Sequence, residues 1–209
     1  RPRETEMPLL IASNNAGKLE EFAALLHPLA LATPRQLGLS VQVEESGDSF
    51  AANALLKARA YAAASGLIAV ADDSGLEVDA LGGAPGVLSA RFGGPDLTDA
   101  QRCALLLERL AALPQGTTRS ARFRCWVTAA APDGRTCDAT GTLEGLIATR
   151  MRGDGGFGYD PVFVVPDLGL TVAQMPAALK NGLSHRAQAL RRILPQLRLT
   201  FPELAPAGV

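Results

Sequence analysis

The chain has 209 residues and 47% of them are apolar, so it can bury a sizeable core and has the length of one large domain. Lysines and arginines total 20 against 21 aspartates and glutamates, which leaves a formal net charge of −1. Without a long basic run, binding to nucleic acid or to an anionic membrane is not expected, and a small molecule is the expected partner.

The ends of the chain and its cysteines indicate a cytoplasmic protein. No stretch approaches the roughly 20 apolar residues that span a bilayer, and the charged start differs from a secretory signal. The three cysteines have neither the spacing of a zinc site nor the even count of a disulfide framework, so reduced thiols are expected. We predict a flexible extension over residues 1–6 and a single two-lobed domain over residues 7–205.

In chain order, apolar runs alternate with helical patterns. Strands are predicted over residues 8–12, 41–45, 67–71, 119–131, 135–148 and 161–165. Helices are predicted from the cap residues 13–15 through Leu26, and over 50–64, 98–110 and 184–197. Because the strands over 119–131 and 135–148 return antiparallel, the sheet of this α/β fold is predicted to be mixed. The site is expected at the carboxyl edge of that sheet.

The first candidate site is the turn between the first predicted strand and helix. It consists of Ser13, Asn14, Asn15, Ala16, Gly17 and Lys18. The N–H groups at a helix start and the helix dipole favour an anion, so the turn can bind a phosphate. It lacks the Walker pattern, and an ordinary capped helix with a solvated lysine is the alternative.

Two acidic pairs form the second candidate. Glu44-Glu45 ends one predicted strand, and Asp72-Asp73 follows another that is expected to end abruptly there. Carboxylates repel a triphosphate unless a cation lies between them, and Mg2+ needs only one or two protein carboxylates beside water and phosphate oxygens. A spare aspartate could orient the attacking water. Helix capping and turns are the alternative.

The third candidate is the glycine-rich segment 155–161, where Phe157 offers a stacking face and Asp160 an acceptor. A tight loop whose aromatic rings fill the core is the alternative. The fourth is Lys180 with the segment 184–186, whose adjacent Ser184 and His185 lack the GxSxG turn of a serine hydrolase.

Asn53 and Lys57 stand four residues apart and so share one face of the helix predicted over 50–64. We expect both side chains to be solvated.

Together these segments resemble the inosine triphosphate pyrophosphatase family, also called the dITP/XTP or non-canonical purine NTP pyrophosphatases. The resemblance runs from about Leu9 to Leu197. It rests on SNNAGKLEEF, EESGDSFAANALLKARAYA, ADDSGLEVDALGGAPGVLSARFGG, GFGYDPVF and KNGLSHRAQAL in this order.

The resemblance implies an α/β fold with a long mixed central sheet and flanking helices, two lobes around a deep nucleotide-binding cleft, and a homodimer. It implies Mg2+-dependent hydrolysis of ITP, XTP and their deoxy forms to the monophosphate and pyrophosphate. Ser13 to Lys18 match the triphosphate-binding turn. Glu45 and Asp73 match the Mg2+ ligands, and Asp73 also matches the proton acceptor. The positions matching nucleotide contacts are Ser74, Phe157, Gly158, Tyr159, Asp160, Lys180, His185 and Arg186.

Two other functions, another pyrophosphatase and a nucleotide sensor, are the alternatives. A Maf-like pyrophosphatase acting on pyrimidine or modified nucleotides is disfavoured by GFGYDP and SHR, which match the purine family. A nucleotide sensor that binds without hydrolysis is disfavoured by the presence of Lys18, Glu45 and Asp73.

Overall fold

The computed structural model describes residues 7–204. A seven-stranded sheet has the order β2-β1-β3-β4-β5-β6-β7. The strands are β1 Leu9–Ile11, β2 Leu31–Ala32, β3 Ala69–Val78, β4 Ser120–Ala130, β5 Thr136–Ile147, β6 Phe163–Val165 and β7 Leu170–Thr171. β1 is parallel to β2 and β3, whereas β6 is antiparallel to β5 and β7. The predicted mixed sheet is thereby confirmed.

Five α-helices and five short 3-10 helices are formed by the described residues. The α-helices are α1 Ala16–Leu26, α2 Phe50–Ser65, α3 Asp99–Ala111, α4 Ala177–Leu183 and α5 His185–Thr200. The 3-10 helices are Asp79–Leu81, Gly86–Arg91, Pro166–Leu168, Val172–Gln174 and Pro202–Leu204. No helix among residues 7–204 is both long and apolar enough to cross a bilayer.

Polar residues start the first three α-helices where the sequence places them. The side chains of Asn15, Ser49 and Thr98 each accept a hydrogen bond from a backbone N–H in the first turn of α1, α2 and α3. These bonds satisfy donors that the helix itself leaves without a partner. α2 ends at Gly66, whose φ of 71° lies in the left-handed region that glycine adopts at little cost.

The chain divides into two compact units, and β3, β4 and β5 each contribute residues to both. Among the described residues, unit 1 consists of residues 7–73, 125–141 and 186–204, and unit 2 of residues 74–124 and 142–185. The predicted single domain over 7–205 and its two lobes around a cleft stay predictions. Residues 1–6, predicted to be an extension, and residue 205 lie outside the described part of the chain.

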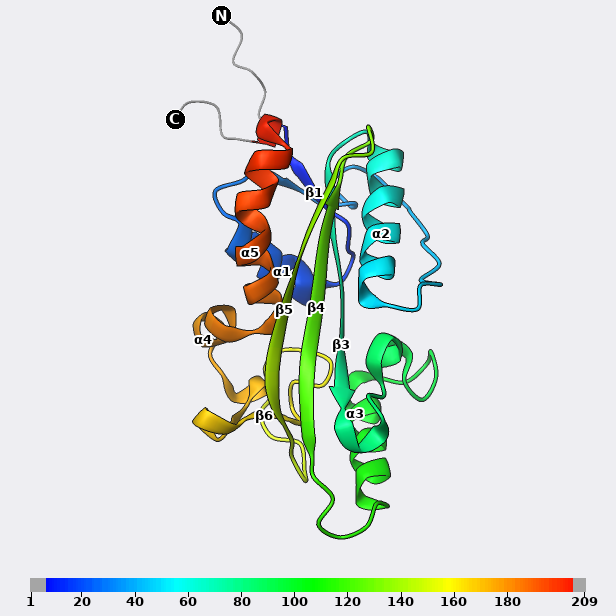
Figure 1. Ribbon diagram of the computed structural model, residues 1–209, viewed down its shortest axis with the longest axis vertical. Coiled ribbons are helices and arrows are strands. Elements are labelled where there is room, and N and C mark those ends of the chain that lie inside the picture. The colour runs from blue at the N-terminus through cyan, green and yellow to red at the C-terminus, as the bar shows by residue number, and fades with distance from the viewer. Residues whose placement is uncertain (1–6, 205–209) are drawn as a thin grey trace, which may run out of the picture. The chain divides into compact units, whose positions relative to one another are not determined.

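In unit 1, helices pack on both faces of the sheet. α1 and α5 cover one face and α2 covers the other (Figure 1). Ile68 and Val70 point towards α1 and α5, whereas Ala69 and Ala71 point towards α2. This alternation follows from the two-residue period of a strand, and it fixes the direction in which the next two side chains of β3 point.

Unit 2 has its own core, in which α3 and the segment around β6 pack against the unit's parts of the long strands. Leu106 of α3 and Phe163 of β6 are both fully buried in it. Phe123 and Phe163 lie with ring centroids 4.4 Å apart. This core supports the glycine-rich segment that precedes β6.

The prediction of a strand over 41–45 is wrong. These residues belong to no strand, and the second strand is β2 instead. Val41 and Val43 pack partly buried against the core beneath α2, while Gln42 and Glu44 are exposed. One-sided packing of an irregular segment therefore produced the alternation that the sequence pattern assigned to a strand.

The third predicted strand does not end before Asp72. β3 continues through Asp72-Asp73-Ser74-Gly75 to Val78. Polar residues usually end a buried strand because an unpaired charge is costly to bury, but here both aspartates are paired. The short elements β2, β7 and α4 were not predicted.

Candidate active site

Asp72 is the centre of a buried ion cluster in unit 1. Its Oδ1 lies 2.9 Å from Nζ of Lys18, and its Oδ2 accepts hydrogen bonds from Nε and Nη2 of Arg186 at 3.1 and 3.0 Å. Nη1 of Arg186 donates to Oε2 of Glu21 at 2.5 Å. Two cations and two carboxylates thus form a charge-balanced chain from α1 through β3 to α5.

Two members of this cluster, Asp72 and Arg186, have pKa values shifted towards their ionised forms despite their burial. Burial alone would raise the pKa of Asp72, but Lys18 and Arg186 hold it well below its ordinary value. Burial alone would lower the pKa of Arg186, but Asp72 and Glu21 raise it. The Asp72 carboxylate thus holds the ammonium of Lys18, the last residue of the turn over residues 13–18.

That turn has the geometry of a helix start. Oδ1 of Asn15 accepts the Lys18 backbone N–H at 3.0 Å, and Oγ of Ser13 accepts the Asn15 N–H at 3.2 Å. Asn14, Asn15 and Ala16 are exposed. The turn therefore exposes the N-terminus of α1, a position that favours an anion, with Lys18 in the first turn of the helix.

Asp73 points to the opposite face of β3, towards α2. Nδ2 of Asn53 donates to its Oδ2 at 3.0 Å, and Nζ of Lys57 lies 3.6 Å from its Oδ1. Burial raises the pKa of Asp73 above its ordinary value, and the Lys57 charge and the Asn53 hydrogen bond oppose this only in part. A carboxylate with a raised pKa is a better proton acceptor near neutral pH.

The Lys57 ammonium joins Asp73 to Glu45. It lies 3.0 Å from Oε1 of Glu45, whose side chain is one-third exposed. Burial alone would lower the pKa of Lys57, but the charges of Asp72, Asp73 and Glu45 together raise it. Two carboxylates from separate segments thus converge on a single cation. Glu44, by contrast, is exposed.

In unit 2, Asp160 organises the glycine-rich segment. Its Oδ2 accepts the backbone N–H of Phe157 at 3.0 Å and lies 2.8 Å from Nζ of Lys180. A Cβ at Gly156 would lie 2.0 Å from this oxygen, so only glycine allows the backbone to approach so closely. The buried carboxylate therefore sets the conformation of the loop.

Lys180 also lies over an aromatic ring. Its Nζ is 4.6 Å from the ring centroid of Phe157, within the range of a cation–π contact. Phe157 and Gly158 are partly exposed, whereas the hydroxyl of Tyr159 is buried and donates to the Ser89 carbonyl at 2.8 Å. Phe157 is thus the ring of this segment that can stack on a ligand, while Tyr159 fills the core.

The segment 184–186 is buried where α5 begins. The ring of His185 stacks on Phe123, with centroids 4.8 Å apart and planes inclined by 15°. Ser184 is 2% exposed, and its N–H donates to the Lys180 carbonyl at 2.9 Å. Packing therefore holds this segment in one conformation.

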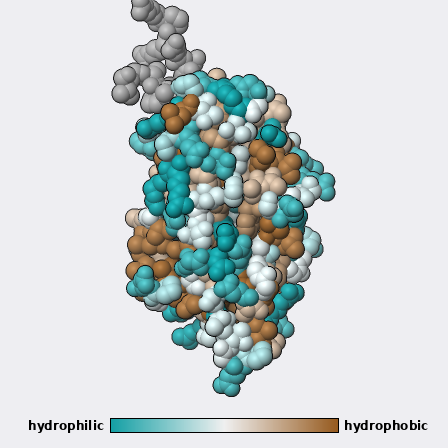
Figure 2. Space-filling model, viewed as in Figure 1, coloured by the Kyte–Doolittle hydropathy of each residue, from teal (hydrophilic) through white to brown (hydrophobic). Residues whose placement is uncertain are grey.

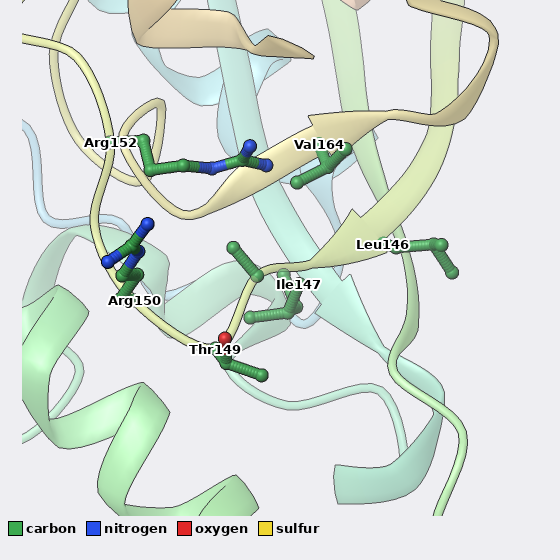
Figure 3. Close-up of a pocket in the computed structure, with 7 residues that line it drawn as sticks. Leu146, Ile147, Thr149, Arg150, Arg152 and Val164 are labelled. Atoms are coloured by element: carbon green, nitrogen blue, oxygen red, sulfur yellow. The ribbon is translucent and has the colours of Figure 1, made fainter. Parts of the chain in front are cut away.

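A surface pocket of about 410 Å³ lies elsewhere in unit 2 (Figure 3). In the picture the side chain of Arg152 extends along β6 towards Val164, and Arg150 lies on the neighbouring loop. None of the predicted site residues lines this pocket. This pocket is therefore separate from the candidate site residues.

Comparison with known proteins decides the family, because residues 9–196 match the Ham1 family. This chain belongs to the Ham1 family. A relative from Desulforamulus reducens, named dITP/XTP pyrophosphatase, is 47% identical over 93% of this chain and 98% of its own.

Two solved structures resemble this Ham1 protein. A HAM1 protein from Coxiella burnetii has a TM-score of 0.83 at 39% identity, over 92% of this chain and 99% of its own. A Mycobacterium abscessus structure, titled nucleoside-triphosphatase / dITP/XTP pyrophosphatase, has a TM-score of 0.72 at 41% identity, over 90% of this chain and 100% of its own. The family resemblance noted in the sequence is confirmed.

The predicted site residues of this Ham1 protein fall into two groups. Unit 1 holds the turn over 13–18 together with Glu45, Asp73 and Arg186. Unit 2 holds Phe157, Gly158, Tyr159, Asp160, Lys180 and His185, as well as Ser74, which directly follows Asp73 in β3.

Three polar residues of unit 1 have a more central place in the structure than their sequence pattern indicates. Asn53 and Lys57 were expected to be solvated, which is wrong, because Asn53 is fully buried and the Lys57 side chain is 13% exposed. Their four-residue spacing in an alanine-rich helix was the available signal. Glu21 was not singled out, although it lies three residues after Lys18 and so on the same face of α1.

We expect Asp72→Asn to lower the free energy of unfolding by about 3–5 kcal/mol, because it leaves the buried Arg186 and the partly buried Lys18 facing a neutral amide. Chemical denaturation in the presence of a chelator measures this. Asp133→Asn is the matched control, since Asp133 pairs with Arg135 on an exposed hairpin and should contribute little.

The Asp72 effect should also depend on pH. Because the pKa of Asp72 is lowered in the folded protein, its stabilisation is present above the ordinary value near ~4 and is lost as the pH falls below it. The stability difference between wild type and Asp72→Asn should therefore begin to narrow at about pH 4 and go on narrowing as the pH falls further. A constant difference would contradict the assignment.

Proposed function

We propose that this protein hydrolyses non-canonical purine nucleoside triphosphates, such as dITP and XTP, to the monophosphate and pyrophosphate. The supporting observation is the pairing of a buried Asp73, whose pKa is raised, with Glu45 at a single cation. The names of its relatives, dITP/XTP pyrophosphatase, support the choice of substrate. In a cell this reaction would cleanse the nucleotide pool.

Mg2+ is the metal that this donor set fits. Glu45 and Asp73 already share the Lys57 ammonium, so their oxygens face one cation position. Among residues 7–204 no group of three or more His, Cys, Asp or Glu side chains could hold a metal. Two carboxylates are nevertheless enough for Mg2+, which takes its other ligands from water and phosphate oxygens.

Asp73 is proposed as the group that orients and deprotonates the attacking water, which adds to the α phosphorus as pyrophosphate departs. Lys18 neutralises charge on the phosphates from its fixed place beside Asp72, and the turn over residues 13–18 donates backbone N–H groups. Bound Mg2+ would supply further neutralisation of the phosphate oxygens. No covalent intermediate is needed.

The unit 2 residues are proposed to bind the base. Phe157 offers its ring to a purine, and Lys180 and Asp160 fix that ring and its loop. Donors from the segment 184–186 would meet the 6-oxo group of hypoxanthine or xanthine. Adenine carries an amino donor at that position, and a mismatch of donors in a buried site can discriminate by about 10⁴-fold.

The two rival functions are less well supported. Mere nucleotide binding does not require a buried carboxylate with a raised pKa, so a non-hydrolysing sensor leaves Asp73 unexplained. A Maf-like enzyme for pyrimidine or modified nucleotides does not account for the membership in the Ham1 family.

We also propose a cytoplasmic homodimer, on the family resemblance. The described part of unit 2 exposes large apolar side chains, among them Leu146, Met151 and Leu168. Figure 2 shows hydrophobic patches between hydrophilic ones on the face that it draws. Light scattering should give about twice the chain mass of 21.8 kDa, and a monomer mass would refute the dimer.

The reaction is tested by a panel of dITP, XTP, dATP, dGTP, dCTP and dTTP, with separate detection of phosphate and pyrophosphate. We expect rapid release of pyrophosphate from dITP and XTP and loss of activity in excess chelator. Release of orthophosphate would overturn the proposed bond, and a preference for a pyrimidine nucleotide would favour the Maf-like alternative.

Asp73→Asn should lower kcat by about 10²–10⁴-fold, the loss typical when a general base is removed. Nucleotide binding should stay measurable by calorimetry. Near-normal turnover would remove Asp73 from the mechanism.

Two neighbouring glutamates provide a matched comparison for the metal. Glu45→Gln should raise the Mg2+ concentration needed for half-maximal activity, because Glu45 shares the cation position with Asp73. Glu44→Gln removes a charge of the same kind one residue away, from an exposed side chain, and should leave this concentration nearly unchanged. The reverse result would exchange the roles of the two residues.

A further inference from the structure

Asn53 is a fully buried carboxamide that connects two segments of the proposed metal site. Its Oδ1 accepts the backbone N–H of Gly47 at 2.9 Å, and its Nδ2 donates to Oδ2 of Asp73 at 3.0 Å. Gly47 lies two residues after Glu45 in the irregular segment before α2. One side chain therefore holds both the segment that carries Glu45 and the carboxylate of Asp73.

The helix itself does not require this residue. α2 is already capped by Ser49, and asparagine has a lower helix propensity than the alanines around position 53. Burying a carboxamide is unfavourable unless both of its ends are hydrogen-bonded, and here both ends are. The contacts of Asn53 thus belong to the segments it joins and not to the stability of α2.

Gly47 shows independently how closely the segment approaches Asn53. A Cβ at position 47 would lie 2.6 Å from Oδ1 of Asn53 and 2.8 Å from Cβ of Ala52. The glycine is therefore required by close packing. The backbone after Glu45 therefore packs closely against α2 at Ala52 and Asn53 and is hydrogen-bonded there by Asn53.

We infer that Asn53 is a positioning residue that fixes the separation of the Glu45 and Asp73 carboxylates, so that both can bind one divalent cation. This inference rests on the proposed function of the site. Asn53 acts only through its two neighbours and touches neither substrate nor metal. Residues that orient metal ligands typically change metal affinity or activity by about 10–100-fold when they are replaced.

The test is Asn53→Ala, with Mn2+ as the probe. Its binding is followed by electron paramagnetic resonance in the presence of an α,β-methylene analogue of dITP, which cannot be hydrolysed between these phosphates. We expect Mn2+ affinity to fall by about 10–100-fold and kcat for dITP to fall in parallel. KM for dITP should change far less, because the groups proposed to bind the phosphates and the base are untouched.

Gly47→Ala disturbs the contact between the segment after Glu45 and Asn53. It provides a second test if Asn53→Ala does not fold. The added methyl displaces the segment from Oδ1 of Asn53, so Mn2+ affinity should fall here too. In the double variant Gly47→Ala/Asn53→Ala the added methyl no longer meets Oδ1 of Asn53, because that side chain has been removed. The two losses should therefore be less than multiplicative, as for residues acting through one shared contact.

Ser49→Ala is the matched control in the same helix. It removes the hydrogen bond from Ala52 N–H to Oγ of Ser49 at 3.3 Å without touching Asn53. It should lower the melting temperature and leave Mn2+ affinity and kcat unchanged. If Ser49→Ala lost as much Mn2+ affinity as Asn53→Ala, the effect of Asn53 would be purely structural and the inference would be overturned.

The outcomes separate this inference from the proposed function. If wild type releases pyrophosphate and binds Mn2+, and folded Asn53→Ala does both equally well, only the role of Asn53 fails. If wild type binds no Mn2+ beside the analogue, the proposed metal site fails and this inference fails with it.

Discussion

The arrangement of unit 1 depends on one buried carboxylate in the middle of a strand. Asp72 is stable there because Lys18 and Arg186 approach it from two helices, and Glu21 balances the remaining charge. A buried ion whose partners are removed is strongly unfavourable, so the three elements that supply these groups must assemble together. The lysine proposed to bind phosphate is positioned by the same ion cluster.

Because side chains alternate along a strand, the two adjacent aspartates of β3 lie in different environments. Asp72 continues the face of Ile68 and Val70 towards α1 and α5, and Asp73 continues the opposite face towards α2. Asp72 is held by permanent cations and keeps a low pKa, while Asp73 has a raised one. Identical residue types thus differ in chemistry because a strand turns successive side chains to different environments.

Local contacts could be predicted from the sequence, whereas contacts between distant residues could not. Helix starts at Asn15, Ser49 and Thr98 follow from local hydrogen bonding and were predictable. The continuation of β3 through Asp72 depends on partners 54 and 114 residues away, which no local pattern contains. The burial of Asn53 depends likewise on Asp73, so its short-range pattern resembled a solvated helix face. Motif order identified the family and the candidate residues, whereas their division of labour required the tertiary contacts.

Arg186 shows how the ion cluster bears on specificity. Sequence reasoning treated it as a predicted nucleotide contact, and its contacts in unit 1 are with the carboxylates of Asp72 and Glu21. These hydrogen bonds restrict the rotation of the guanidinium, and the adjoining His185 stacks on Phe123. Discrimination by a missing acceptor requires donors that do not relax towards another partner. The same charges that stabilise Asp72 in a strand therefore also hold in place Arg186, the residue proposed to contact the base.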